Sequence, residues 1–525
     1  MTKDILDIFV IGGGVNGVAI ARDAAGRGYR VILSEQDDLA SKTSSNSTKL
    51  FHGGLRYLEY LDISLVREGL RERQILLNNM PHIAWPLRFV IPLDEKLRVN
   101  TNSPVSRLLK IAMPWLKGRR PDWIIRLGLF IYDMLAGRFT LEPTKKLNLD
   151  NCEEGIPLKS KFKKAYEYSD VWVDDARLVS LMARDAKERG AQILTRNNVV
   201  SFERKKEYWK INTLQGIFKS RVLINAAGPW AQKVAKGFTC AKSGSQLRLV
   251  KGSHIVTTKL YDHDKAYFFI GEDGRIMFSL PFQKNYTVIG TTEVLIKNED
   301  EVPICSPKEI KYICKFASEY FKQPITEKDI VWKYSGIRPL FEDKSDNTTG
   351  ISRDYFFTLN DHNGQMPLLS VFGGKLTTHR ALAENALKKI ESYLGVRARW
   401  THSTKLPGGD FNLENRNNLM KKLGKEYDFL KDQTVERLFR NYGLDSWTIL
   451  GSSKSFRDLG ENFGSDLYAK EIEFLVKNEF VQSAEDVLWR RTKLGLVINE
   501  KKAHRIDTYI QRILQQDATR LKKNA

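Results

Sequence analysis

The sequence predicts a mixed α/β protein (α+β overall) built of three parts, and three observations carry this prediction. A glycine-rich turn between an apolar strand and a helix opens the chain at residues 7–35. Alternating strand patterns dominate residues 241–364, and helical spacing dominates the residues after 407. We therefore expect a Rossmann-like dinucleotide-binding domain over 1–240, completed by 365–400, an antiparallel-sheet domain over 241–364, and a C-terminal helical domain over 401–525.

Length, cysteine content and charge restrict the possible classes of protein. A chain of 525 residues is too long for one core, and its four cysteines form no C-x-x-C pair, which is typical of a reducing compartment. The first residues lack a basic and apolar signal, so we expect a cytoplasmic protein. The net charge of +21 indicates phosphorylated substrates, nucleic acid or an anionic membrane, without choosing among them. No uncharged apolar run reaches the roughly 20 residues of a spanning helix.

The opening turn has the chemistry of a dinucleotide site. Gly12 allows the tight turn, Gly14 lets the backbone approach a pyrophosphate, and Gly17 lets the helix lie close to its strand. Free N–H groups and the helix dipole then hold the phosphates. Glu35 follows Gly17 by eighteen positions, where an acid accepts hydrogen bonds from a ribose. A turn without a cofactor would leave Glu35 unexplained.

Three further segments offer polar groups to a long anionic ligand. Residues 43–58 combine hydroxyl side chains with Lys49, His52 and Arg56, although a solvated loop with a helix cap would look similar. A strand ends in "NAAGPWA", where Gly228 permits close backbone approach, or forms a simple strand-to-helix turn. A third strand enters residues 373–378, which open a helix suited to negative charge, or a threonine-capped turn.

The sheet domain contributes the remaining candidates. His254 lies in one expected strand, Arg338 in "SGIRPL" and Arg353 in "SRDY". A lone histidine in a strand is more often structural than catalytic, and lone arginines are usually surface residues. The residues alone do not decide between these alternatives.

The segments together resemble a known family. The run "TSSNSTKLFHGGLRYLE", placed just after "VIGGGVNG", is similar to the FAD-dependent, respiratory glycerol-3-phosphate dehydrogenases. Later matching segments follow in family order over nearly the whole chain. They are "EYSDVWVDDARLV", "NAAGPWA", "KGSHIV", "IGTTE", "YSGIRPL", "SRDY", "LLSVFGGKLTTHRALAE" and "DVLWRRTKLG".

The resemblance implies that FAD is the cofactor and that residues 241–364 bind the substrate. The resemblance also implies that His254, Arg338 and Arg353 are functional residues and not structural or surface ones. The implied cofactor-binding residues are Gly12, Gly13, Gly14, Asn16, Gly17, Glu35, Ser44, Ser45, Lys49, Leu50, His52, Gly53, Val199 (near the adenine), Gly228, Gly374, Lys375, Leu376 and Thr377.

The implied reaction is oxidation of sn-glycerol 3-phosphate to dihydroxyacetone phosphate, with hydride passing from C2 to the flavin and electrons to a membrane quinone. A phosphate dianion needs fixed cations, for which Arg56, Arg353 and Lys375 are candidates. His254 is the expected base because its charge changes near neutral pH, and Arg338 would orient the C2 oxygen. Tyr57 would hydrogen-bond to the substrate. The roles of these residues could be exchanged between the phosphate clamp and the contact with the C2 oxygen. No metal ligands are expected.

Residues 95–140 depart from the family pattern, and this segment is longer than is usual in the family. Apolar residues could line one side of a short helix while basic residues meet lipid phosphates, as in an in-plane membrane helix. The alternative is an amphipathic helix packed on the core. The apolar residues are Trp115, Trp123, Ile124, Leu127, Phe130 and Ile131, and the basic ones are Arg107, Lys110, Lys117, Arg119, Arg120 and Arg126. The resemblance implies peripheral attachment to the inner face of the cytoplasmic membrane, and a homodimer is possible.

The C-terminal helical part leaves one question open. Ser483 and Asp486 stand in capping-box positions, and the run 489–493, Trp-Arg-Arg-Thr-Lys, could be an interface or a solvated helix face. Rival functions are an oxygen-using glycerol-3-phosphate oxidase, an FAD-linked amine or amino-acid oxidase, and a flavin-containing nucleic-acid binder. The last is suggested by charge alone and lacks a basic stripe with stacking aromatics, so we expect no nucleic acid partner.

Overall fold

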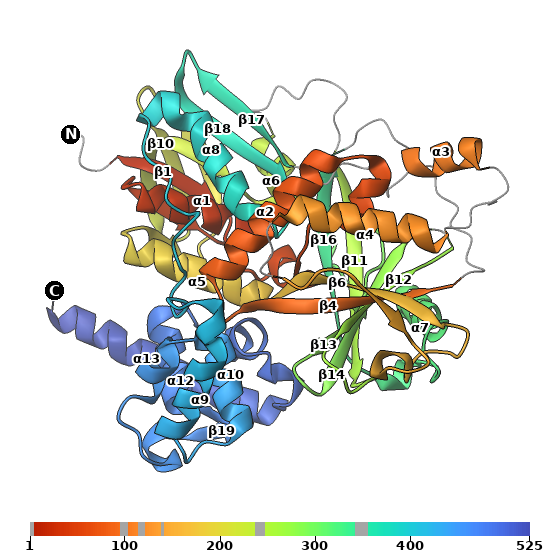
Figure 1. Cartoon of the computed structure of the whole chain (residues 1–525). Helices are drawn as coiled ribbons and strands as arrows, with labels where there is room; N and C mark the ends of the chain where they lie inside the picture. The colour runs from red at the N-terminus through yellow and green to blue at the C-terminus, as the bar shows by residue number, and fades with distance from the viewer. Residues whose placement is uncertain are drawn as a thin grey trace.

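A computed structural model describes residues 5–94, 103–113, 121–137, 141–236, 247–272, 274–341 and 355–524. Two large sheets and a helical domain make up the molecule (Figure 1). The first sheet runs in the order β17 (Tyr355–His362), β18 (Gln365–Gly373), β10 (Gly216–Asn225), β1 (Leu6–Ile11), β2 (Val31–Ser34) and β7 (Gln192–Leu194). A meander of β8 (Val199–Arg204) and β9 (Trp209–Thr213) joins it at β10.

The first sheet is parallel through β18, β10, β1, β2 and β7. Strands β2 and β18 and the C-terminal halves of β1 and β10 are mostly apolar and buried, as parallel strands usually are. In register, Ile11 at the end of β1 lies between Ser34 of β2 and Asn225 of β10. The carboxyl ends of three strands therefore meet at one edge. Helix α1 (Val15–Gly26) packs between α5 (Asp175–Glu188) and α8 (His379–Leu394) (Figure 1).

The second sheet is antiparallel except where β12 pairs β4 in parallel. Its path is β15 (Val294–Ile296), β11 (Leu247–Thr258), β14 (Tyr286–Gly290), β13 (Ile276–Phe282), β12 (Ala266–Ile270), β4 (Ala84–Leu93), β6 (Lys164–Val173) and β3 (Leu50–Phe51). Strand β16 (Ile330–Phe341) pairs β11, and β5 (Lys145–Asn148) pairs β6. Helix α7 (Pro307–Ser318) lies close to β11 and β14.

Sheet membership departs from the predicted ranges. Strands β3 to β6 lie within residues 1–240 but belong to the second sheet, and β17 lies within 241–364 but pairs β18 of the first. Hydrophobic periodicity identifies a strand from its neighbours in sequence. It does not identify the strand's pairing partner, which for β4 and β12 lies 177 positions away, since Ala266 pairs with Phe89. The chain therefore crosses between the sheets several times.

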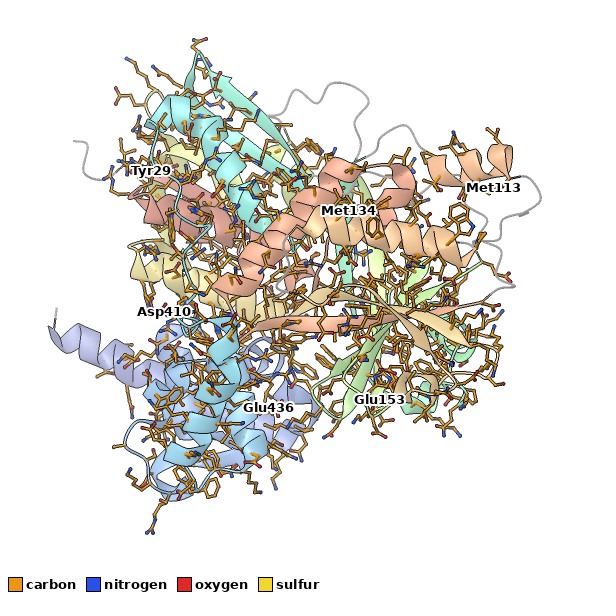
Figure 2. All side chains as sticks on the ribbon, in the orientation of Figure 1. Tyr29, Met113, Met134, Glu153, Asp410 and Glu436 are labelled. Carbon is orange, nitrogen blue, oxygen red and sulfur yellow. The ribbon has the colours of Figure 1, made fainter. Side chains whose placement is uncertain are left out.

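Three helices cover the side of the molecule to which the described parts of residues 95–140 belong (Figure 1). They are α2 (Ile63–Asn79), α3 (Pro104–Ala112) and α4 (Asp122–Ala136). The inner face of α4 packs on α2 through Leu129 and Tyr132, and the Tyr132 hydroxyl donates to Asp170 at 2.8 Å. Figure 2 labels Met113 and Met134 on this side, away from the C-terminal domain. None of the described helices is both long and apolar enough to span a membrane.

The C-terminal domain has its own apolar core and is held to the first sheet by buried ion pairs. Asp38 accepts from Arg490 at 2.5 Å and from Arg491 at 2.6 Å, and Arg177 of α5 pairs with Glu479. The run 489–493 is therefore an interface. The domain consists of α9 (Arg416–Glu426), α10 (Asp432–Tyr442), α11 (Asp445–Leu450), α12 (Ala469–Asn478), the π-helical turn η9 (Asp486–Arg491) and α13 (Glu500–Asn524).

Two smaller features of this domain follow from the sequence. The predicted capping box is present, since the Ser483 amide donates to Asp486 at 3.0 Å and the Asp486 amide donates to the Ser483 hydroxyl at 3.4 Å. Figure 2 places Glu436 of α10 at the boundary with the β13–β14 turn, where it pairs with Lys284. Asp410 lies where the chain enters the domain. The domain thus touches both sheets.

Candidate active site

The turn after β1 brings backbones together so closely that side chains have no room. Gly12 has φ +110°, and a Cβ built on it would lie 2.6 Å from the carbonyl oxygen of Ala226. A Cβ on Gly17 would lie 2.0 Å from the oxygen of Gly12. These distances require glycine at both positions. The N-terminus of α1 is thereby left open beside the ends of β1 and β10, which is the geometry of an anion site.

Glu35 stands at the end of β2 as the spacing predicts. Its carboxylate accepts from the Gly13 amide at 2.6 Å and from the Asp37 amide at 2.9 Å. Burial raises the pKa of Glu35, while the two backbone donors oppose that rise. The hydroxyl of Ser44 accepts from the Val15 amide at 2.9 Å, so a side chain from the 43–58 segment lies beside the helix N-terminus and engages one of its amides.

Two hollows open from this turn and share part of their lining. The first, which we call the glycine-side hollow, has a volume of about 360 Å³ and contains Glu35, Val199 and Trp230 in its wall. The second, the arginine-side hollow, has a volume of about 300 Å³. Residues common to both walls are Gly14, Thr43, Ser44, Ala226, Gly228 and Pro229. The two hollows therefore adjoin at the sheet edge, and together we call them the groove.

The arginine-side hollow collects four cationic side chains from distant parts of the sequence: Arg56, Arg275, Arg338 and Lys375. The Lys375 ammonium lies 4.1 Å from the centre of the Tyr57 ring, and Arg338 donates to the Thr291 hydroxyl at 3.4 Å. Nη2 of Arg56 is buried and has no hydrogen-bond partner among the described residues. A buried donor without a partner is costly, so this atom indicates a site for an acceptor that comes from outside the chain.

Two carboxylates temper the charge of the arginine-side hollow. Asp170 and Glu293 lie in its wall. Asp170 pairs with Arg73 at 2.6 Å, and burial raises the pKa of Asp170 to about 6 although Arg73 and the Tyr132 hydroxyl oppose the rise. Because Asp170 already has these partners, the net field in the hollow stays positive.

His254 lies beside this hollow in a fully buried position. Its Nε2 is 3.0 Å from the Thr48 hydroxyl, and its ring stacks on Tyr334 at 4.8 Å. Burial lowers the pKa of His254 well below 6.5, and the charges of Arg338 and Lys49 lower it further. The expectation that its charge changes near neutral pH is wrong for this environment. The imidazole is neutral.

The hollows include most of the predicted ligand-binding side chains. The predicted residues in the walls are Gly12, Gly14, Asn16, Glu35, Ser44, Leu50, His52, Arg56, Tyr57, Val199, Gly228, Arg338, Gly374, Lys375, Leu376 and Thr377. The walls do not include Gly13, Gly17, Ser45, Lys49, Gly53 or His254. Arg353 and the predicted membrane residues Trp115, Lys117, Arg119 and Arg120 lie outside the described residues.

Lys49 turns away from the groove. Its ammonium pairs with Asp175 at 2.8 Å and donates to the Ser45 carbonyl at 3.0 Å. Thr48 and Arg275 line the arginine-side hollow, and sequence reasoning missed both. A lone arginine before a strand carries no local signal of a site, whereas the position of Thr48 inside the hydroxyl-rich run could have suggested it.

The groove fits a dinucleotide with a second ligand at one end. The Asn16 amide donates to the Gly373 carbonyl at 3.1 Å, while its oxygen is buried without a partner among the residues described. The turn before α8 faces the same hollow through Lys375 and Thr377. The helix N-termini suit a pyrophosphate, and the buried unpaired amide oxygen suits a polar ring system. The cationic pocket suits an anionic substrate.

Comparisons with known proteins agree with this geometry. The sequence model of the FAD dependent oxidoreductase family matches residues 7–380, and that of the C-terminal domain of alpha-glycerophosphate oxidase matches residues 399–521. The glycerol-3-phosphate dehydrogenase of Pseudomonas aeruginosa is 42% identical over 515 residues, covering 97% of this chain and 95% of the relative. The chain belongs to the FAD-dependent glycerol-3-phosphate dehydrogenase family.

Other similar proteins are named for glycerol 3-phosphate or for a related sugar-alcohol phosphate. The aerobic glycerol-3-phosphate dehydrogenase of Escherichia coli is 40% identical, covering 97% of this chain and 98% of the relative. The D-erythritol 1-phosphate dehydrogenase of Brucella abortus is 41% identical, covering 94% and 95%. A glycerol-3-phosphate dehydrogenase structure from Bacillus halodurans with FAD has a TM-score of 0.68 at 24% identity, covering 98% and 95%, and shows the shared fold.

These findings confirm the predicted fold class, the FAD cofactor and the oxidoreductase class. The individual contacts to FAD stay a prediction. The described residues contain no group of three or more His, Cys, Asp and Glu side chains arranged to hold a metal ion.

The Gly17→Ala variant should lose FAD, because its new Cβ would lie 2.0 Å from the Gly12 oxygen and push α1 away from the turn. We expect affinity for FAD to fall about tenfold or more, a loss of about 1.4 kcal/mol. The ratio of flavin absorbance to protein after purification measures this. Gly128→Ala is the control, since nothing described lies within 4 Å of its added Cβ. Equal flavin content in both variants would contradict the assignment.

Proposed function

We propose that this protein oxidises sn-glycerol 3-phosphate to dihydroxyacetone phosphate and passes the electrons to a membrane quinone. Bound FAD supplies the hydride acceptor. The observation that carries the proposal is the arginine-side hollow, where four cationic side chains meet at one end of a groove whose other end has dinucleotide geometry. Relatives named for glycerol 3-phosphate at 40–42% identity support the same substrate class.

The phosphate of the substrate would bind at Arg56, with Lys375 and Arg275 completing the clamp. A dianion shared among guanidinium and ammonium groups gains charge-assisted hydrogen bonds that single cations cannot supply. Nη2 of Arg56 provides a buried donor that the described residues leave unsatisfied. The predicted clamp residue Arg353 stays a prediction.

The C2 hydroxyl would lie near Arg338, which orients its oxygen and stabilises negative charge there. His254 would take the proton as a neutral acceptor. Thr48 lines the hollow and its hydroxyl is 3.0 Å from Nε2 of His254. The proton would therefore pass through the Thr48 hydroxyl to Nε2, because His254 itself lies behind the wall.

Removing Arg338 should change both the rate and its pH dependence. In Arg338→Met we expect flavin reduction about 100-fold slower, as for loss of one oxyanion donor. Because Arg338 lowers the pKa of His254, its loss should raise that pKa and move the acid limb of the reduction rate upward toward pH 6.5. Stopped-flow reduction across pH measures both effects.

The comparison for this test is Arg56→Met. It removes a proposed phosphate contact and should weaken substrate binding while leaving the acid limb in place. Normal single-turnover reduction in Arg338→Met, or an acid limb that does not move, would refute the role given to Arg338.

Substrate identity rests on one direct measurement. Anaerobic addition of sn-glycerol 3-phosphate should bleach the oxidised flavin spectrum, since the hollow offers cations to a phosphate ester. D-Erythritol 1-phosphate is the comparison, because a relative named for it is equally similar. A spectrum unchanged by glycerol 3-phosphate, whether or not the tetritol ester bleaches it, would contradict the proposal. Peroxide formed in step with turnover would instead favour the oxidase alternative.

Helices α3 and α4 support attachment to an anionic membrane. Trp123, Leu127, Phe130 and Met134 recur at helical spacing on α4 and are each about half exposed or more, and Ile111 of α3 is 80% exposed. The predicted residues Ile124 and Ile131 are half-buried, so the two faces of α4 are both apolar. A helix that packs on the core and also exposes an apolar stripe is typical of an interface.

A variant carrying Trp123→Glu and Phe130→Glu should lose membrane binding, because carboxylates would replace apolar rings next to anionic lipid. We expect affinity for anionic liposomes, measured by flotation, to fall about 100-fold or more, since each of the two buried rings contributes about 1.5 kcal/mol or more. Val396→Glu is the control, because Val396 is 79% exposed and lies after α8, on another part of the chain. Unchanged flotation of the double variant would exclude this face. A cytoplasmic-side location and a homodimer stay predictions.

A further inference from the structure

Four charged side chains are buried together behind the wall of the arginine-side hollow. Lys49, Asp174, Asp175 and Lys493 are each 5% exposed or less. Lys49 pairs with Asp175 at 2.8 Å, and Lys493 lies 3.6 Å from Asp174. The set carries two positive and two negative charges, so it is neutral as a whole. Buried charge is tolerated only when it is compensated in this way, which makes each member sensitive to the loss of another.

One member of this quartet comes from the C-terminal domain. Lys493 follows the π-helical turn η9, and its ammonium also donates to the Trp489 carbonyl at 2.8 Å. The other members lie in the FAD-binding part, with Asp174 and Asp175 at the start of α5. The quartet therefore joins the C-terminal domain to the segment that carries Lys49.

The quartet fixes the segment that lines the hollow. Asp175 accepts from the Ser47 hydroxyl at 2.7 Å and from the Ser47 amide at 3.2 Å. Lys49 has a positive φ of 61°, a conformation that needs support in a residue with a side chain. Thr48 stands between these two held residues and contacts His254 at 3.0 Å. Its hydroxyl is thus placed by its neighbours on both sides.

A second path runs along one face of β16. Trp332, Tyr334, Gly336 and Arg338 alternate on the strand and share that face. Trp332 stacks on Trp489 at 4.7 Å, and Tyr334 stacks on His254 and donates to the Ser47 carbonyl at 3.1 Å. Arg338 ends the line inside the hollow. The C-terminal domain therefore touches the far end of a strand face that leads to the site.

We propose that Lys493 and Trp489 are positioning residues, through which the C-terminal domain holds the Thr48 hydroxyl and the His254 ring in place for the reaction. Neither residue lines the hollow in the described structure. Their effect passes through the neutral quartet and through Trp332 and Tyr334. This inference rests on the proposed function, because it concerns the same site.

Lys493→Met tests the ionic path. It leaves Asp174 and Asp175 with one quartet cation, so Lys49 should be drawn from its place and the 43–52 segment should loosen. We expect faster amide hydrogen exchange in 43–52 of the FAD-loaded protein, flavin reduction about tenfold slower, and a KM for glycerol 3-phosphate within about twofold, since misplacement acts on the chemical step. Lys493→Arg, and the neutral pair Asp174→Asn with Lys493→Met, should restore both measurements in part.

Arg437→Met is the matched control. Arg437 pairs with Glu471 at 2.6 Å inside the C-terminal domain, so its loss should weaken that domain without loosening 43–52. Trp489→Leu tests the stacking path and serves if Lys493→Met does not fold. Unchanged exchange in 43–52 in the variants of Lys493 and Trp489, or equal loosening in Arg437→Met, would overturn the proposal. Exchange is measured without substrate, so failure of glycerol 3-phosphate to reduce the flavin would count against the proposed function alone.

Discussion

The close backbone approach between Gly12 and Ala226 is the constraint on which the rest of the structure depends. A Cβ at Gly12 would lie 2.6 Å from the Ala226 oxygen, so β1, β10 and α1 can meet only through glycine. That meeting opens the helix N-terminus and aligns the carboxyl ends of the strands. Ligands of open α/β sheets bind at such an edge. The two hollows lie along it, and the second sheet adds Arg275 and Arg338 to the wall of the arginine-side hollow.

The arginine-side hollow concentrates like charges that repel one another before any ligand binds. Arg56, Arg275, Arg338 and Lys375 come from four separate segments, and the wall carboxylate Asp170 is already engaged by Arg73 and Tyr132. A hydrophobic core gains nothing from this arrangement. Functional sites often contain clustered charges that destabilise the folded protein, and a bound ligand of opposite charge offsets this cost. The same field explains why His254 is neutral, since Arg338 and Lys49 lower its pKa beyond the effect of burial.

Local chemistry predicted the parts of the site whose signal lies within a short stretch. Gly12, Gly17 and Glu35 were found because turn conformation and strand spacing are set by neighbours in sequence. The pairing of β4 with β12 and the gathering of Arg275 into the hollow were not found, because both depend on contacts across the fold. For the run 489–493 the sequence does not distinguish an interface from a solvated helix face, since arginines that contact Asp38 and arginines that face water have the same spacing. The sequence predicts that the charge of His254 changes near neutral pH. Burial lowers the pKa of His254 and removes that reason for choosing it as the base.

Buried charge pairs join the C-terminal domain to the rest of the chain, in addition to the stacking of Trp489 on Trp332. Arg490 and Arg491 enclose Asp38, Arg177 meets Glu479, and all five side chains are buried. Breaking one member of such a set leaves an uncompensated buried charge and costs several kcal/mol, whereas an apolar contact of similar size could slip at small cost. The main effect of these buried ion pairs is therefore to fix the position of the C-terminal domain, and their net contribution to stability is smaller. Asp38 lies in the loop after β2 (Val31–Ser34), three residues beyond Glu35, so the position that the ionic joint defines is that of the loop leading into the groove.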